Sequence, residues 1–330
     1  MSCGICFSLF VCLCLSGCDR YANFSLPPPT PSSPTNSFDW KPDTSPVLSP
    51  GDWDSADVLN PSVLHKDNQY YNLYSGFDGT TWHTGLALSH DGIHWQKQGR
   101  IISPNSGSWE GSYIAANGSA LLSQSEIFYW YQAGPRDLPE IGLAHSSDGR
   151  QWRKHPAPVL AHGPRGSWDE RGVADPYVLR IGDSHYMYYL GQDRARRQRL
   201  GVARSRDGVR WQKLRANPIL ELGPDSAFDE NGLGEPAVWQ SNGKYWMLYT
   251  GRDRIENRRL GLARSRDGVT WEKLPGSFAG SERWNNKVIC DPSVLVEGDS
   301  IRVWFGGGDV ASPDENLHGQ IGVANLIPKL

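Results

Sequence analysis

GLALSHDGIHWQK at residues 85–97 is the first of four copies of one stretch in this chain; the others are GLAHSSDGRQWRK at 142–154, GVARSRDGVRWQK at 201–213 and GLARSRDGVTWEK at 261–273. The four tryptophans are 57, 59 and 60 residues apart. Each copy is typical of a β-hairpin, because Gly in an Asp-Gly turn can adopt a positive φ and Asp can bond its own backbone. A regular period of this length indicates a repeat protein.

Two further strands are expected before each hairpin. A short segment of the form x-Pro-x-Val-Leu comes first, and an aromatic strand that ends in Gly follows it. The first segments of the five repeats begin at Asn60, Asn117, Asp175, Glu235 and Asp291. Four antiparallel strands per unit, repeated radially, describe a β-propeller. The sequence therefore predicts an all-β fold, a five-bladed β-propeller.

The fifth repeat lacks its last strand, because the chain reaches Leu330 without another Asp-Gly-x-x-Trp. The sequence FDWK at 38–41, followed by SPVL at 45–48, matches WQK at 211–213 followed by NPIL at 217–220. We therefore expect residues 38–48 to form the outer strand of the last blade. This pairing would close the ring and remove sheet edges that invite aggregation.

The N-terminus predicts export. Residues 1–18 form an apolar run that is too short to span a bilayer and is typical of a signal peptide. Its ending, Leu-Ser-Gly-Cys18, resembles the bacterial lipobox, and an ordinary cleaved signal is the alternative. Residues 19–36, rich in Pro, Ser and Thr, are expected to form an extended tether that buries little, and residues 37–330 the propeller. The protein would then be lipid-anchored to a bacterial membrane, facing the periplasm or the outside.

Composition limits the partners. A net charge of -3 and a pI of about 6.3 give no electrostatic footprint for nucleic acid. After cleavage only Cys18 and Cys290 would remain, so no intrachain disulfide is expected. We expect a monomer that contacts the membrane through its lipid alone. No cofactor should be required, and a structural cation in the central channel is left open.

The residues that begin the five inner strands are the candidate site. In a propeller they would converge on one funnel, where crowded carboxylates raise each other's pKa and are more often kept for chemistry than for packing. The alternative is that these side chains only cap turns, although Glu is a poor turn former. Trp168, in a loop between blades, is either a spacer or a platform for a sugar ring, and Arg194 and Arg252 could bind a substrate.

Five blades with Asp-Pro and Glu-Pro at inner-strand starts resemble the five-bladed propeller glycosidases, which include arabinanases, β-xylosidases, invertases and levansucrases of glycoside hydrolase families 43, 32 and 68. The resemblance implies that Glu235 is the general acid and that Asp175 orients and tunes it. An Asp is expected where the first blade has Asn60, so Asp291 or Asp57 would have to supply the base or nucleophile.

The Asn-Pro start is also similar to the mannoside phosphorylases of family 130, although Asn117-Gly-Ser lacks the Asp of their second blade. Asn60 and Asn117 are expected to bind substrate. The sequence thus predicts a glycosidase that acts on oligosaccharides or polysaccharides outside the cytoplasm. The alternative is a propeller that binds carbohydrate without cleaving it.

Overall fold

Almost all of the regular secondary structure in the computed structural model, which describes residues 20–30, 35–123 and 125–329, is β-strand. Hydrogen bonds join the strands into three sheets, of five, eight and eight strands. In the described part, the one helical element is the 3-10 turn Arg283–Asn285. No helix in these ranges is long and apolar enough to cross a membrane.

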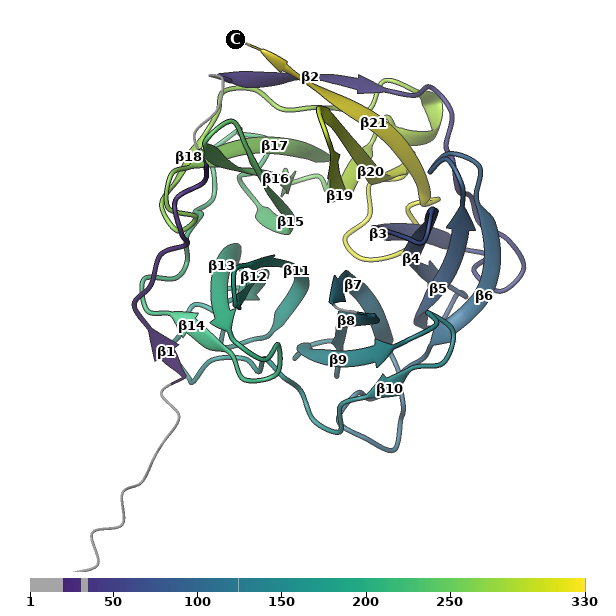
Figure 1. Ribbon diagram of the computed structural model, residues 1–330, viewed down its shortest axis with the longest axis horizontal. Coiled ribbons are helices and arrows are strands. Elements are labelled where there is room, and N and C mark those ends of the chain that lie inside the picture. The colour runs from purple at the N-terminus through teal and green to yellow at the C-terminus, as the bar shows by residue number, and fades with distance from the viewer. Residues whose placement is uncertain (1–19, 31–34, 124, 330) are drawn as a thin grey trace, which may run out of the picture.

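The strands form antiparallel groups in chain order, arranged around a common centre (Figure 1). The first group is β3 (Asp57–Lys66), β4 (Gln69–Phe77), β5 (Trp82–Ser89) and β6 (Gln96–Ile102). The second is β7 (Ile114–Ser123), β8 (Glu126–Ala133), β9 (Glu140–Ser146) and β10 (Arg153–Lys154). The third is β11 (Val173–Ile181), β12 (Ser184–Gln192), β13 (Gln198–Ser205) and β14 (Gln212–Leu214). The fourth is β15 (Gly232–Ser241), β16 (Lys244–Arg252), β17 (Arg258–Ser265) and β18 (Trp271–Lys273).

The fifth group joins the two ends of the chain. It contains β19 (Val288–Glu297), β20 (Ser300–Gly308), β21 (Gln320–Lys329) and the N-terminal β2 (Ser37–Pro42). β2 pairs antiparallel with β21 from Ser37 opposite Lys329 to Pro42 opposite Ala324. Trp40 stacks on Phe278 with ring centres 5.3 Å apart. The predicted pairing of the N-terminal segment with the last strand of the chain is therefore confirmed.

The expected tether is wrong for the part of it that the structure describes. β1 (Tyr21–Ala22) pairs in parallel with β14. Leu26 is 3% exposed and packs in the core between the third and fourth groups, and its N–H donates to Asp267 O at 2.8 Å. Thr35 is also buried. Proline and serine made this segment look like a linker, but its two apolar side chains, Phe24 and Leu26, fill a groove that only the assembled groups create.

The conserved frame of the four stretches has a structural explanation. In the turn of the first copy, Gly92 has φ 75° and its N–H donates to Ser89 Oγ at 2.9 Å, while Asp91 Oδ1 accepts from two backbone N–H groups. The Gly92 carbonyl accepts from the indole of Trp304 in the fifth group at 2.7 Å. The same turn in the third copy binds Trp130 of the second group. The turns thus lock neighbouring groups together.

The lysine that ends each stretch belongs to a buried network of Lys, acid and Tyr. In the third group, Lys213 Nζ lies 2.5 Å from Asp169 Oδ2 and over the ring of Tyr189. Three other groups repeat the arrangement, with Lys97–Asp54–Tyr74, Lys154–Glu110–Tyr131 and Lys273–Asp229–Tyr249. The fifth group has the neutral Asn285 at the position of the acid, where it caps the turn that starts at Glu282.

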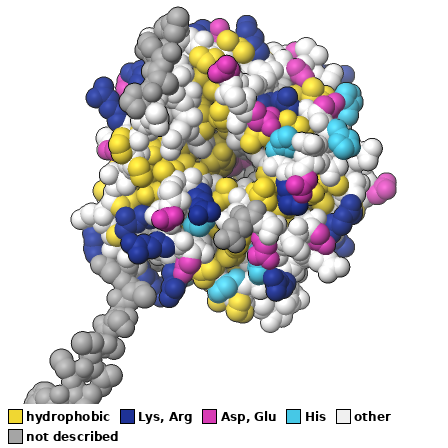
Figure 2. Space-filling view, viewed as in Figure 1, with side chains coloured by type: hydrophobic (Ala, Val, Ile, Leu, Met, Phe, Trp, Pro, Cys, Tyr) yellow, Lys and Arg dark blue, Asp and Glu magenta, His cyan; other side chains and the backbone are white. Residues whose placement is uncertain are grey.

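Charged side chains of both signs are interspersed over the face shown in Figure 2, and they do not gather into one patch of a single sign there. The distribution agrees with the net charge of -3.

Candidate active site

The five inner strands share one irregularity. In β3, β7, β11, β15 and β19 the register shifts by a bulge at the residue that begins the x-Pro-x-Val-Leu segment. These residues have φ between 45° and 54°: Asn60, Asn117, Asp175, Glu235 and Asp291. A bulge re-aims a side chain, and the left-handed conformation costs a residue other than Gly about 1–2 kcal/mol. Asn and Asp tolerate it better than Glu, so strain at Glu235 favours a functional role.

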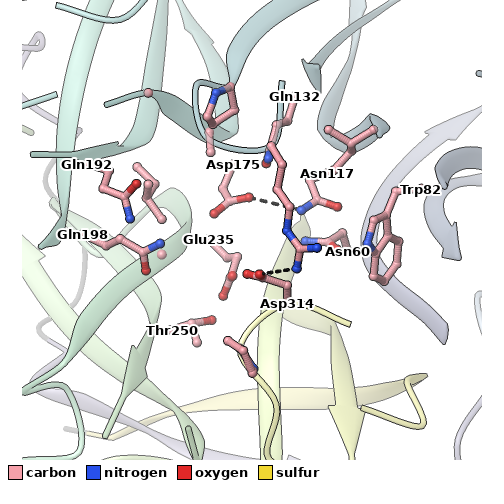
Figure 3. Close-up of a pocket in the computed structure, with 18 of the residues that line it drawn as sticks. Asn60, Trp82, Asn117, Gln132, Asp175, Gln192, Gln198, Glu235, Thr250 and Asp314 are labelled. Atoms are coloured by element: carbon pink, nitrogen blue, oxygen red, sulfur yellow. Dashed lines mark hydrogen bonds and ion pairs between the residues drawn. The ribbon is translucent and has the colours of Figure 1, made fainter. Parts of the chain in front are cut away.

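All five bulge residues line one cavity of about 220 Å³ at the centre of the ring. Figure 3 shows Asn60, Asn117, Asp175 and Glu235 from separate strands facing this cavity, with Gln132, Gln192, Gln198 and Trp82 around them. We call the cavity the funnel. The predicted convergence of the inner-strand starts is therefore present.

Amides hold two of the three carboxylates at the inner-strand starts. Asn60 Nδ2 donates to Asp291 Oδ1 at 2.8 Å, and the Asn60 backbone N–H donates to Asp291 Oδ2 at 3.2 Å. Asn117 Nδ2 donates to Asp175 Oδ1 at 3.4 Å, and Ser75 Oγ fixes that amide at 2.9 Å. Glu235 differs, because its Oε2 is buried without a hydrogen-bond partner among the described residues. An unpaired buried oxygen costs free energy and points to a ligand group that would pair with it.

The crowding changes the protonation of this cluster. Burial, followed by the charges of Glu235 and Asp291, raises the pKa of Asp175 well above its ordinary value. Burial and Glu235 raise the pKa of Asp291 to about 7. The Cys290 thiol, whose pKa is raised by burial and then by Asp291, donates to Asp291 Oδ2 at 3.0 Å. Near neutral pH these raised pKa values favour the protonated forms of Asp175 and Cys290 and leave Asp291 partly protonated.

Arginines line the wall above the carboxylates. Arg252 and Arg258 lie directly opposite each other on β16 and β17. Burial, followed by the Arg258 guanidinium, lowers the pKa of Arg252. Burial lowers the pKa of Arg258, but electrostatic interactions with Cys290, Glu235 and Asp291 outweigh burial and raise this pKa above its ordinary value. Like charges opposite each other in a sheet repel; here Arg252 is paired with Glu256 at 3.3 Å, and Arg258 donates to the carbonyls of Ser312 and Pro313. Arg136, Arg171 and Arg196 also line the funnel.

The structure separates the predicted site residues into two sets. Those that line the funnel are Asn60, Asn117, Asp175, Glu235, Asp291 and Arg252. Asp57 does not: its carboxylate is buried and accepts from the N–H groups of Asn316 and Gly319 at 2.6 and 2.7 Å. The idea that Asp57 replaces the missing base is therefore wrong, because both its oxygens hold a loop.

Trp168 and Arg194 are also absent from the funnel lining. Trp168 packs against Tyr189, and an added Cβ at Gly191 or Gly201 would collide with its ring. Trp168 is thus a spacer and not a sugar platform. Arg194 is exposed in the loop between β12 and β13, from which Arg196 enters the lining instead.

Sequence reasoning missed Asp314, which lines the funnel from the connection between β20 and β21. The available signal was loop length. This connection spans residues 309–319, whereas the corresponding connection of the first group spans only 78–81.

The sequence predicts no metal site and leaves a structural cation in the central channel open. Within residues 20–30, 35–123 and 125–329, no group of three or more His, Cys, Asp or Glu is placed to hold a metal ion. A structural cation in the central channel stays a prediction.

A central funnel of carboxylates, surrounded by groups of antiparallel strands, suits an enzyme that uses acid–base chemistry. Two family models match the chain: the glycosyl hydrolases family 32 N-terminal domain over residues 61–219, and beta-1,4-mannooligosaccharide phosphorylase over residues 191–297. These two matches support a carbohydrate-active enzyme of the glycosidase type, within the superfamily of propeller glycosidases. The alternative of a propeller without catalytic activity is therefore not favoured.

Two relatives and one solved structure illustrate what the chain is similar to. The Mycobacterium tuberculosis (strain ATCC 25618 / H37Rv) protein Rv1502 is 30% identical over 228 residues, which cover 64% of this chain and 75% of that protein. The beta-1,2-mannobiose phosphorylase of Thermoanaerobacter sp. (strain X514) is 30% identical over 210 residues, 59% of this chain and 64% of that enzyme. A solved structure described as a glycoside hydrolase superposes with a TM-score of 0.72 at 17% identity, covering 88% of this chain and 92% of that one.

Proposed function

We propose that the protein hydrolyses glycosidic bonds in oligosaccharides or polysaccharides, with Glu235 as the proton donor. The observation that carries this proposal is the unpartnered Oε2 of Glu235, buried in the funnel on a strained bulge. A general acid must reach the leaving oxygen, and a carboxyl group already committed to protein partners could not do so. Asp175 would tune Glu235 through charge, and Asn60 and Asn117 would orient sugar hydroxyls.

In the proposed reaction, Glu235 gives its proton to the glycosidic oxygen as the bond from that oxygen to the anomeric carbon breaks. Water adds to the anomeric carbon and loses a proton to a second carboxylate. One carboxyl group ends ionised and the other protonated, and exchange with solvent restores both. Asp291 is the first candidate for the second carboxylate from the inner strands, since at its pKa of about 7 it is partly ionised at neutral pH.

The test is Glu235→Gln, compared with wild type on a panel of chromogenic glycosides and short β-mannosides. Loss of the acid should lower kcat by roughly 100-fold or more. Glu272→Gln is the matched control, because Glu272 is exposed on β18 and pairs with Arg264 on the neighbouring strand β17. Equal activity of Glu235→Gln and wild type on every substrate that wild type cleaves would refute the assignment.

A second candidate function is phosphorolysis, in which phosphate takes the place of water. The arginines of the funnel favour it, and so does the resemblance to beta-1,2-mannobiose phosphorylase. Guanidinium groups suit phosphate because they can donate two hydrogen bonds at once. The two functions differ in their products, since phosphorolysis requires added phosphate and releases a sugar 1-phosphate. Cleavage at an equal rate with and without phosphate would exclude this candidate.

We further infer that the strand groups are the five blades of a propeller. The support is that the same bulge, with a positive φ, recurs in β3, β7, β11, β15 and β19. Export with a lipid on Cys18 is also proposed, on the strength of the Leu-Ser-Gly-Cys ending at 15–18. That ending lies outside the residues that the structure describes. Carbohydrate is the proposed partner, and a monomer is the proposed state.

A further inference from the structure

The connection between β20 and β21 reaches from the fifth group toward the centre of the ring (Figure 1). Its residues 309–319 are held by side chains of other groups. At one end the Arg258 guanidinium donates to the carbonyls of Ser312 and Pro313 at 3.1 and 2.6 Å. At the other end Asp57 accepts from the N–H groups of Asn316 and Gly319. A connection pinned at both ends has a fixed position over the funnel.

Two acids lie between these anchors, and they face different surroundings. Asp314 lines the funnel, and its Oδ2 accepts from Arg136 Nη2 at 2.8 Å. Glu315 is absent from the funnel lining; it accepts from Tyr113 Oη at 3.0 Å and from the same Arg136 at 3.1 Å. Figure 3 shows Asp314 among the inner-strand residues, with its ion pair dashed. Of the two, only Asp314 can meet a ligand in the funnel.

Glycoside hydrolysis requires two carboxyl groups on opposite sides of the scissile bond. Asp175 and Asp291 line the funnel with Glu235, and each is buried and accepts a hydrogen bond from an amide side chain, of Asn117 and Asn60 respectively. Burial also raises their pKa values, which favours the protonated form of Asp175 and leaves Asp291, with a pKa of about 7, only partly ionised at neutral pH. Asp314 comes from the rim, its side chain is half exposed, and the guanidinium of Arg136 holds it in an ion pair. It can therefore contact both water and a sugar bound over Glu235.

We propose that Asp314 is the general base that activates the attacking water, opposite the proton donor Glu235. This inference rests on the proposed hydrolytic function. In the step, Asp314 accepts a proton from water as the water oxygen bonds to the anomeric carbon from the face opposite the leaving group. The electron pair of the broken bond leaves with the glycosidic oxygen, which Glu235 protonates. The configuration at the anomeric carbon is inverted.

In the proposed reaction, the contacts that Asp57 and Arg258 make with the connection 309–319 have a function. Asp57 and Arg258 act as positioning residues, because they fix the connection that carries Asp314. Asp57 thus serves the site from the first group by holding the loop, and it does not contact the substrate.

The experiment compares Asp314→Asn with Glu315→Gln in the full-length protein, on aryl glycosides with leaving groups of different acidity. Both residues share Arg136 and one loop, so a merely structural effect should appear in both variants. We expect Asp314→Asn to lower kcat by about 100-fold to 10,000-fold with a similar factor for every leaving group, and Glu315→Gln to stay within about fivefold of wild type. Glu235→Gln should instead recover on substrates whose leaving group needs no protonation.

Chemical rescue of activity by azide distinguishes a general base from a residue that only supports the structure. Azide added to Asp314→Ala should replace the activated water and give a glycosyl azide of inverted configuration. If the wild-type enzyme gives a product of retained configuration, Asp314 is not the general base. Full activity of Asp314→Asn, with Glu235→Gln inactive, would also exclude that role. In both cases the proposed hydrolysis would stand. If Glu235→Gln is also fully active, the proposed function and this inference both fail.

Discussion

Replacing Lys213 by Met should cost about 3–5 kcal/mol of folding free energy, the range for removing one partner of a buried ion pair. The Lys213 side chain is 6% exposed and its partner Asp169 is fully buried, with Nζ 2.5 Å from Oδ2. Nζ also donates to the Ala161 carbonyl at 2.6 Å. Met fills the space of the lysine stem but offers no charge or donor. Asp169 would keep only Ser167 Oγ, at 2.9 Å, as a side-chain donor in the described part of the chain.

The loss of folding free energy depends on how deeply the lysine is buried, so the equivalent lysine of another repeat provides an internal control. Lys97 makes the same contact with Asp54, but its side chain is 25% exposed, and water can partly replace it. Lys97→Met should therefore lose less than Lys213→Met. The double variant Lys213→Met with Asp169→Asn should recover much of the loss, because it imitates the neutral Asn285 of the fifth group.

The assay is urea unfolding followed by tryptophan fluorescence, with a thermal melt alongside. A domain of about 300 residues loses roughly 2 °C in Tm per kcal/mol, so Lys213→Met should melt roughly 5–10 °C below wild type. A loss below about 1 kcal/mol, or equal losses for Lys213→Met and Lys97→Met, would refute the argument that the buried acid requires its lysine.

Three further outcomes are expected. The pKa of Asp291 rises from an ordinary 3.8 to about 7 on folding, so the folded protein holds this proton more tightly and should lose stability as pH rises from about 4 to 7. Asp291→Asn should flatten that decline in a plot of Tm against pH. Parallel curves for the variant and wild type would contradict this expectation. A chain that begins at Ser37 loses the buried Leu26, so its folding free energy should fall by roughly 2–5 kcal/mol and its Tm should lie below that of the full-length protein. A chain that begins at Gly51 also loses β2 and should aggregate. Equal Tm values for the full-length chain and the Ser37 chain would show that Leu26 contributes nothing. Cys18→Ser should move the protein from the membrane to the soluble fraction, and soluble, unmodified wild type would exclude the lipid.

Local sequence determined the strand order, the turns and the pairing of the two chain ends. An Asp-Gly turn is specified by residues within a few positions of it, because it depends on Asp bonding its own backbone and on Gly adopting a positive φ. The repeat period then fixed which segments are equivalent. For that reason Trp40 could be matched to the outer strand of the fifth group from sequence alone, and the inner-strand starts from Asn60 to Asp291 could be placed together.

Only the tertiary structure decided which acids face the funnel. Asp57 lies three residues before Asn60, yet its side chain holds a distant loop, whereas Asp314 enters the funnel from that same loop. The bulge at each inner-strand start re-aims one side chain, and this change of direction depends on the register with the neighbouring strand. Leu26 likewise looked like part of a linker, because the groove that buries it forms only when the third and fourth groups pack together. A turn forms between residues that are near in sequence, whereas long-range packing determines which residues line the same cavity.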